Sequence, residues 1–203
     1  HKYVNDIEAR EDGGTPAFLQ TIKTALAIKL KDKMGVQNII DREHEIHKIV
    51  WNNFMKLKNV HVLADNFSER LGIYSFYIDD LHFNLAVQLL NDKYGIQVRG
   101  GCSCAGTYGH ILLDVAKKKS SEITSKINQG DLTLKPGWVR MSIHPTMTND
   151  EVDFIMKAIK ELSENHQNWS SDYNYNNKTN EFVYNNIKFS LKNKVRAESW
   201  FHL

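Results

Sequence analysis

The sequence contains little cysteine, and what it has lies in one short stretch. Cys102 and Cys104 are the two cysteines among 203 residues. Side chains at positions i and i+2 rarely reach the geometry that an unstrained disulfide needs. The sequence therefore argues against a disulfide framework, and we expect both side chains to be free thiols.

Long apolar runs and a strong excess of one charge are also missing. No apolar stretch approaches the roughly 18 residues that suggest a membrane span, and the N-terminus lacks the charged-then-apolar pattern of a signal peptide. The 26 basic and 24 acidic residues are interspersed and give a net charge of +2, so no basic face indicates nucleic-acid binding. We expect a cytoplasmic protein that binds neither membranes nor nucleic acid. Because the chain opens with His1 instead of methionine, we also expect a processed or truncated product.

The pattern of apolar residues predicts an α+β fold. The predicted helices span residues 16–34, 36–57, 81–94 and 148–162, and the predicted strands span residues 59–64, 73–78, 96–99 and 138–143. Gly35 and Gly95 are the predicted ends of the first and third helices, and Thr148 with Glu151 predicts a capping box at the start of the last. A further helix is expected over 108–129, with a break at the run Lys117 to Lys119, which we interpret as a solvated connector. This order predicts a small, largely antiparallel sheet covered by helices on one face.

Composition divides the chain into three segments. Residues 1–14 form a polar N-terminal segment, residues 15–163 form a compact domain, and residues 164–203 form an extension rich in asparagine and tyrosine. Within this extension, residues 172–178 have the composition of a loop, and Phe182 to Leu191 show a weak alternation that predicts a strand.

The stretch around the two cysteines concentrates the most chemistry. Gly100 and Gly101 follow a predicted strand and allow the backbone to turn sharply, which presents the thiol of Cys104 at the strand end. A turn rich in backbone N–H groups beside Arg99 favours the thiolate, which is the working nucleophile. Two other interpretations stay open: the cysteines pack as small buried side chains, or they bind zinc together with His110 or His144, for which the C-x-C spacing is unusual.

Other histidines carry less weight. His44 and His47 are three residues apart on a predicted helix, but no cysteine or carboxylate stands at ligand spacing from them. We therefore interpret both as exposed helix-surface residues and expect no metal site.

Two arginines form a second candidate group. Alternation along residues 138–143 directs Val139 and Met141 to one face and Arg140 to the other, away from the core. Arg99 is placed similarly in its own strand, so the two guanidinium groups can converge on the polar side of the sheet. Guanidinium is a natural fork for a carboxylate. Surface ion pairs with nearby acids are the alternative.

A glycine-rich helix start forms the third candidate group. Gly13 and Gly14 are followed by Thr15, which can cap a helix, and by Pro16, which suits the first helical position. The motif favours a plain helix cap. The alternative is an anion site, because free N–H groups at a helix N-terminus can bind a phosphate.

Taken together, these motifs resemble a known family. The Gly13 to Pro16 helix start, the turn from Tyr94 to Ala105, and Val139 to Ser142 followed by Thr148 to Asp153 are similar to the C-terminal part of the class V aminotransferase superfamily. The similarity covers about residues 10–163 in the same order. Within the superfamily, the sequence most resembles the branch of cysteine desulfurases and selenocysteine lyases.

The resemblance implies a pyridoxal-phosphate enzyme of fold type I that acts as a homodimer on a small amino acid. It implies that Cys104 takes sulfur from the substrate as a persulfide and leaves alanine, and that a sulfur-acceptor protein then takes this sulfur. Arg140 matches the arginine that binds the substrate carboxylate, and Arg99 matches a second arginine of that pocket. Gly14 and Thr15 match the segment that reaches across the dimer to the cofactor phosphate.

Three departures from the family pattern limit what can be carried over. Cys102 and Ser103 stand where the family often has histidines, and the connection between Cys104 and Arg140 is longer than in compact members. No lysine matches the Schiff-base lysine, which lies upstream of the glycine motif in the family. We therefore expect a C-terminal domain from a longer enzyme, inactive by itself, with residues 1–14 at the junction with the large domain. The alternatives are another class V aminotransferase or lyase with a structural thiol, and a stand-alone non-catalytic domain.

Overall fold

The structure, a computed structural model, describes residues 3–102 and 106–185. The chain divides into two compact units, residues 1–42 and residues 43–203, and each is considered by itself. Helix α3 (Val36–Phe54) begins in the first unit and ends in the second.

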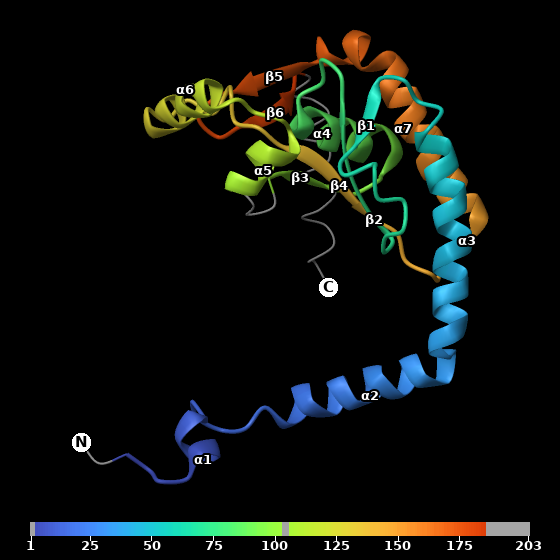
Figure 1. The fold of residues 1–203 in the computed structure, drawn as a ribbon, viewed down its shortest axis with the longest axis vertical. Helices are drawn as coiled ribbons and strands as arrows, with labels where there is room; N and C mark the ends of the chain where they lie inside the picture. The colour runs from blue at the N-terminus through green and yellow to red at the C-terminus, as the bar shows by residue number, and fades with distance from the viewer. Residues whose placement is uncertain (1–2, 103–105, 186–203) are drawn as a thin grey trace, which may run out of the picture. The chain divides into compact units, whose positions relative to one another are not determined.

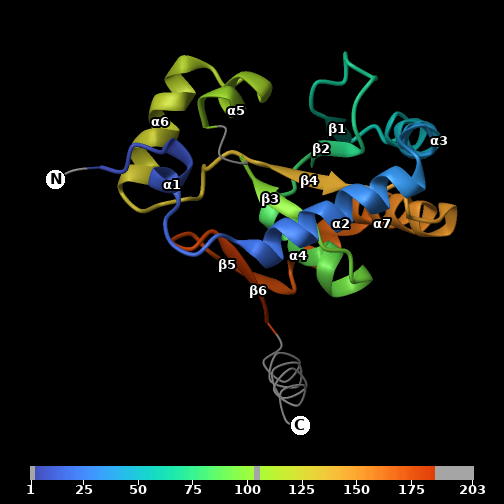
Figure 2. The same cartoon turned by 90° about the horizontal axis from the view of Figure 1, so that it is seen from below.

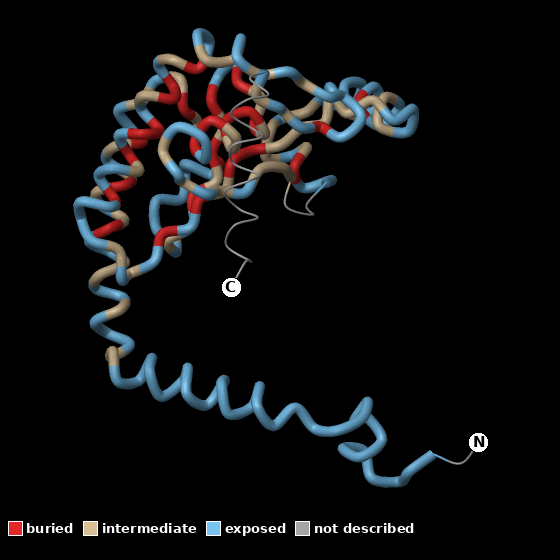
Figure 3. Tube along the Cα trace, turned by 180° about the vertical axis from the view of Figure 1, so that it is seen from behind, coloured by how far each residue is buried: buried red, intermediate tan, exposed pale blue. Residues whose placement is uncertain are grey.

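The first unit contains two helices before α3, namely α1 (Ile7–Glu11) and α2 (Phe18–Met34). The residue that precedes α2 is Ala17, which has no capping side chain, so the predicted cap by Thr15 is wrong. Gly35 ends the helix as predicted, with a φ of +84° that suits glycine. The large apolar side chains from Phe18 to Leu30 are more than half exposed, and nearly all of the helix is pale blue in Figure 3.

The second unit is built on a four-stranded sheet, as predicted. Its strands are β1 (Val60–Val62), β2 (Ile73–Ile78), β3 (Arg99–Gly101) and β4 (Trp138–Ser142). They lie in the order β1-β2-β4-β3, and every neighbouring pair is antiparallel. Helix α3, together with α4 (Phe83–Tyr94) and α7 (Asn149–Ser170), packs on one face of this sheet (Figure 1). The predicted α+β class and the covered face are confirmed.

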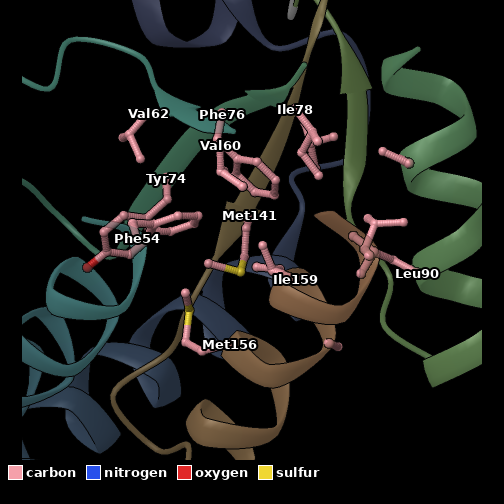
Figure 4. Close-up of a cluster of buried hydrophobic side chains, with 14 of the residues drawn as sticks. Phe54, Val60, Val62, Tyr74, Phe76, Ile78, Leu90, Met141, Met156 and Ile159 are labelled. Carbon is pink, nitrogen blue, oxygen red and sulfur yellow. The ribbon is translucent and has the colours of Figure 1, made fainter. Parts of the chain in front are cut away.

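Alternation in β2 produces the core. Tyr74, Phe76 and Ile78 are buried and meet side chains of α3, α4 and α7 (Figure 4). The ring of Phe54 lies 5.2 Å from that of Phe76, between centroids. Burial raises the pKa of Tyr74 to about 12, and its hydroxyl lies 2.9 Å from Nδ1 of His47. His47 is thus half-buried and stacked on Tyr74, and our expectation of an exposed histidine is wrong at this position.

The helix ends of the second unit follow their sequence signals. Thr148 and Glu151 form the predicted capping box: the Thr148 hydroxyl accepts from the Glu151 N–H, and the Glu151 carboxylate accepts from the Thr148 N–H at 2.7 Å. The hydrogen bonds that the Thr148 N–H and hydroxyl donate to the carboxylate lower the pKa of Glu151. Gly95 ends α4 in the left-handed conformation, as predicted, and His82 caps its start by accepting from the Asn84 N–H.

Three elements differ from the prediction. The strand expected over 96–99 instead spans Arg99–Gly101, and the expected helix break comes before the lysines, between α5 (Gly106–Leu112) and α6 (Lys117–Asn128). The lysines form the first turn of α6, because lysine has a good helix propensity and Asp114, with a φ of +49°, turns the chain ahead of it. The loop expected over 172–178 is wrong for its central part: β5 (Tyr173–Asn176) pairs with β6 (Glu181–Tyr184) as a separate hairpin, and residues 177–180 form the turn between them.

Gly100 sets how closely β3 approaches α4. A Cβ atom at this position would lie 2.7 Å from Oδ1 of Asn84 and 3.0 Å from Cγ2 of Val87. Any side chain at this position would therefore displace either β3 or the side chains of α4 that lie against it. Because Arg99 precedes Gly100 and the cysteine turn follows it, this close approach fixes where both candidate groups stand.

Replacing Gly100 by alanine should therefore lower the free energy of unfolding by about 1–3 kcal/mol, the usual cost of an overpacked contact. Gly13→Ala is the control, because a Cβ atom there meets no neighbour within 4 Å, and we expect it to change stability by less than about 0.5 kcal/mol. Chemical denaturation measures both values. Equal midpoints for Gly100→Ala and the unsubstituted chain would contradict the close approach.

Candidate functional site

Arg99 and Arg140 stand directly opposite each other on neighbouring strands. They are Cα partners in the antiparallel pairing of β3 with β4, and the next partner across the sheet is Ser75 of β2. The buried residues of β4 that join the core are Val139 and Met141, so Arg140 lies on the opposite face. Directly opposite residues on one face have Cβ atoms roughly 4.5–5.5 Å apart. The register thus brings the two arginines together, and their binding role stays a prediction.

Within residues 3–102 and 106–185, neither guanidinium group forms an ion pair with a carboxylate. Like charges directly opposite each other destabilise a sheet. Nε of Arg140 is buried and has no hydrogen-bond partner among the residues that the structure describes. A buried donor without an acceptor costs free energy. An anion between the two guanidinium groups would reduce the repulsion and could also accept from Nε, so the geometry suits a bound carboxylate.

The cysteine turn begins where β3 ends. Gly101 has a φ of +115° and leads into Cys102, whose thiol is free and partly buried. A Cβ atom on Gly109 of α5 would lie 3.2 Å from the Trp138 ring and 3.8 Å from the Cys102 Cβ. The lack of a side chain on Gly109 thus lets α5 pack closely on Trp138 and on Cys102. Cys104 and Ser103 fall outside the described residues.

The predicted phosphate-binding residues lie in the first unit. Gly14 has a φ of +144°, which favours glycine, and a Cβ atom there would meet nothing within 4 Å. Within the described ranges, neither Gly14 nor Thr15 makes a hydrogen bond, and both are exposed. Their backbone N–H groups stand free just before α2. The donor set fits a phosphate at the N-terminal side of a helix, as pyridoxal phosphate would require.

Sequence reasoning did not single out Ser75. Its alternation with Tyr74 and Phe76 places it on the open face, but the strand pairing that sets it opposite Arg140 cannot be deduced from one strand alone. A second group on this face was also missed: His61 of β1 stacks on Tyr77 at 4.8 Å between centroids, and its Nε2 lies 2.9 Å from the Asp79 carboxylate.

The histidines named as alternative zinc ligands have other partners. Nδ1 of His110 lies 2.8 Å from the Ser120 hydroxyl, and Nδ1 of His144 lies 2.8 Å from the Thr146 hydroxyl. Across the part of the chain that the structure describes, no three residues among histidine, cysteine, aspartate and glutamate form a group that could hold a metal ion. In the same residues, no helix is both long enough and apolar enough to span a membrane.

A family model described as aminotransferase class-V matches residues 1–155. The chain belongs to the class V aminotransferase family. A probable cysteine desulfurase of Synechocystis is 22% identical over 79% of this chain and 33% of the relative. A probable cysteine desulfurase of Pyrococcus abyssi is 28% identical over 75% of this chain and 33% of the relative.

Solved structures agree with this assignment. The apo cysteine desulfurase of Thermococcus onnurineus NA1 matches with a TM-score of 0.55 and 26% identity, over 76% of this chain and 33% of that one. The cysteine desulfurase CsdA of Escherichia coli, at 17% identity and a TM-score of 0.51, shows the fold alone. The resemblance to the cysteine desulfurase branch is confirmed. The chain spans about a third of the length of these relatives.

If the two arginines repel each other, removing one charge should stabilise the protein at low salt. We expect Arg99→Gln to raise the free energy of unfolding by about 0.2–1 kcal/mol. We also expect sulfate to stabilise the unsubstituted chain more than the variant, because the ion bridges two arginines in the unsubstituted chain and contacts one in the variant. Denaturation at several sulfate concentrations measures both effects. Lys118→Gln, an exposed lysine of α6, controls for the lost charge. Equal sulfate responses in all three proteins would contradict a shared anion site.

Proposed function

We propose that this chain provides the substrate-binding and sulfur-accepting part of a pyridoxal-phosphate-dependent cysteine desulfurase of the cytoplasm. One observation carries the proposal: two arginines stand opposite each other on β3 and β4, and β3 leads within three residues of Arg99 to the cysteine turn. A carboxylate fork and a thiol therefore belong to one short strand and the turn that follows it. The family assignment and the desulfurase relatives support the same conclusion.

The arginines bind and orient the substrate. Arg140, with its buried Nε, donates to the carboxylate of a small amino acid, and Arg99 donates from the neighbouring strand. This fork fixes the carboxylate end of the molecule. With that end held, the sulfur of the substrate is directed toward the cysteine turn.

The thiol performs the transfer. The thiolate of Cys104 forms a bond to the substrate sulfur while the carbon–sulfur bond breaks. The substrate carbon keeps the electron pair of that bond and takes up a proton, which leaves alanine and a persulfide on Cys104. An acceptor protein then removes the outer sulfur. Positive charge from Arg99 and the backbone N–H groups of a glycine-rich turn favour the thiolate that this step needs.

The cofactor site is divided between parts of the assembly. Gly14 and Thr15 hold the phosphate of pyridoxal phosphate in a second copy of the chain, so activity requires a homodimer. When bound, the cofactor supplies the electron sink for breaking the carbon–sulfur bond. No lysine of this chain matches the Schiff-base lysine of the family, and we place that lysine outside the present sequence. Residues 1–14 then mark the junction with the domain that carries it, residues 15–163 form the small domain, and residues 164–203 extend it.

Two cysteine variants test the thiol assignment. In the longest form of the protein that its gene encodes, supplied with pyridoxal phosphate and L-cysteine, Cys104→Ala should lower sulfide and alanine release by at least about a hundredfold, because no nucleophile remains to take the sulfur. Cys102→Ala should retain most of the activity. Sulfide release and alanine formation are measured together under a reducing agent.

The same pair of variants separates the second candidate function. The unusual Cys102 and Ser103 context favours a class V aminotransferase or lyase whose thiol is structural. In that case Cys104→Ala leaves turnover of the true substrate intact, and full sulfide release by this variant would refute the proposed role.

The placement of the lysine has its own test. We expect this chain, mixed with pyridoxal phosphate and dialysed, to retain no cofactor absorbance, because it has no amine at the position where the cofactor aldehyde is bound. Absorbance spectra before and after dialysis measure retention. The opposite result would be an absorbance band that survives dialysis, together with a lysine peptide that carries the cofactor after borohydride reduction. This result would show that the lysine lies within this sequence.

A further inference from the structure

The β5–β6 hairpin is a part of the second unit that lies beyond the family match. The match ends at residue 155, whereas the hairpin pairs Tyr173 with Tyr184 and Asn176 with Glu181. It forms a sheet of its own, and it lies beside α4 in both ribbon views (Figures 1 and 2). The hairpin is thus an addition to the region that the family model matches, and its contacts show which parts of the second unit it stabilises.

The first attachment is aromatic. The rings of Tyr175 and Phe182 lie 5.4 and 5.2 Å from the imidazole of His82, between centroids. Both rings are half-buried, whereas Val183, the neighbour of Phe182, points away and is 58% exposed. One face of the hairpin therefore packs on the residue that caps α4.

The second attachment leads to β3. Nδ2 of Asn84 donates to the backbone carbonyl of Asn180, which is a buried residue of the hairpin turn. Oδ1 of the same Asn84 side chain lies 2.7 Å from the position that a Cβ atom would take on Gly100. The hairpin thus reaches, through one side chain, the strand residue that separates Arg99 from the cysteine turn.

The third attachment leads to the far end of the segment that follows β3. The N–H of Leu132 donates to the carbonyl of Asn177 at 2.9 Å, and the Asn177 side chain lies 3.4 Å from the Asp131 carboxylate. Asp131 in turn donates its N–H to the Lys126 carbonyl at the end of α6. Helix α6 contacts α5 through Ser120.

We propose that the β5–β6 hairpin is a positioning element for Cys102 and helix α5: it holds β3 through Asn84 and the turn after α6 through Asn177. Both ends of the connection between β3 and β4 are then tied to one hairpin. Helix α5, which packs on Cys102 through Gly109, is held in place between these ties. The importance of this bracing for sulfur transfer rests on the proposed function. The bracing itself depends only on the contacts of the hairpin and is independent of that function.

The test releases the hairpin and measures Cys102 in this chain as it stands. In Tyr175→Ala, the iodoacetamide reaction rate of Cys102, measured on its peptide by mass spectrometry, should rise on the order of tenfold. Hydrogen exchange over residues 117–133 should accelerate similarly, while β2 stays protected. Tyr175→Phe keeps the ring and should restore slow rates, and Val183→Ala is the matched control on the exposed face. Unchanged alkylation and unchanged exchange over 117–133 in Tyr175→Ala would overturn the proposal.

If Tyr175→Ala also accelerates hydrogen exchange in β2, the variant destabilises the whole second unit, and a milder variant is needed to test the bracing. Asn84→Ala removes the donor to the Asn180 carbonyl and leaves the aromatic packing of Tyr175 and Phe182 in place. Faster alkylation of Cys102 with β2 still protected supports the bracing, and an unchanged rate refutes it. Neither alkylation nor hydrogen exchange uses the cofactor or L-cysteine. A negative desulfurase assay therefore does not refute the bracing, and a negative bracing test does not refute the desulfurase activity.

Discussion

The pairing of β3 with β4 is the constraint on which the rest of the candidate site depends. It sets one guanidinium group opposite another on the open face of the sheet and makes Gly101 the partner of Trp138 just before the cysteines. The pairing is only three residues long. It persists because Gly100 allows β3 to lie directly on α4, where a methyl group would already collide with Asn84. A small backbone contact on the covered face therefore determines the arrangement of charge on the other face.

Much of this arrangement could be predicted from the sequence, because the signals involved are local. Alternation in β4 predicted that Val139 and Met141 join the core, and the Thr148 to Glu151 motif predicted the start of α7. Gly95 predicted the end of α4 in the same way. The opposition of Arg99 and Arg140 was expected only in outline, since strand register depends on pairings between distant residues.

Other features could not be predicted for equally physical reasons. The asparagine-rich residues after α7 have low strand propensity, and they form a hairpin because tertiary contacts with His82 and Asn84 outweigh that propensity. His47 is half-buried because Tyr74, 27 residues away in the sequence, needs a partner for its buried hydroxyl. The lysine run was misread because a charged stretch can form a helix as readily as a connector when a turn precedes it.

The exposure of α2 has a consequence for how the chain behaves in solution. Phe18, Ile22, Leu26 and Leu30 are each between 56 and 63% exposed. Contiguous exposed apolar area drives proteins to associate, and a net charge of only +2 provides little electrostatic repulsion between molecules. Purified by itself, the chain should therefore tend to aggregate. Dilution, low ionic strength and mild detergent should keep it in solution, whereas high protein concentration and kosmotropic salts should favour precipitation.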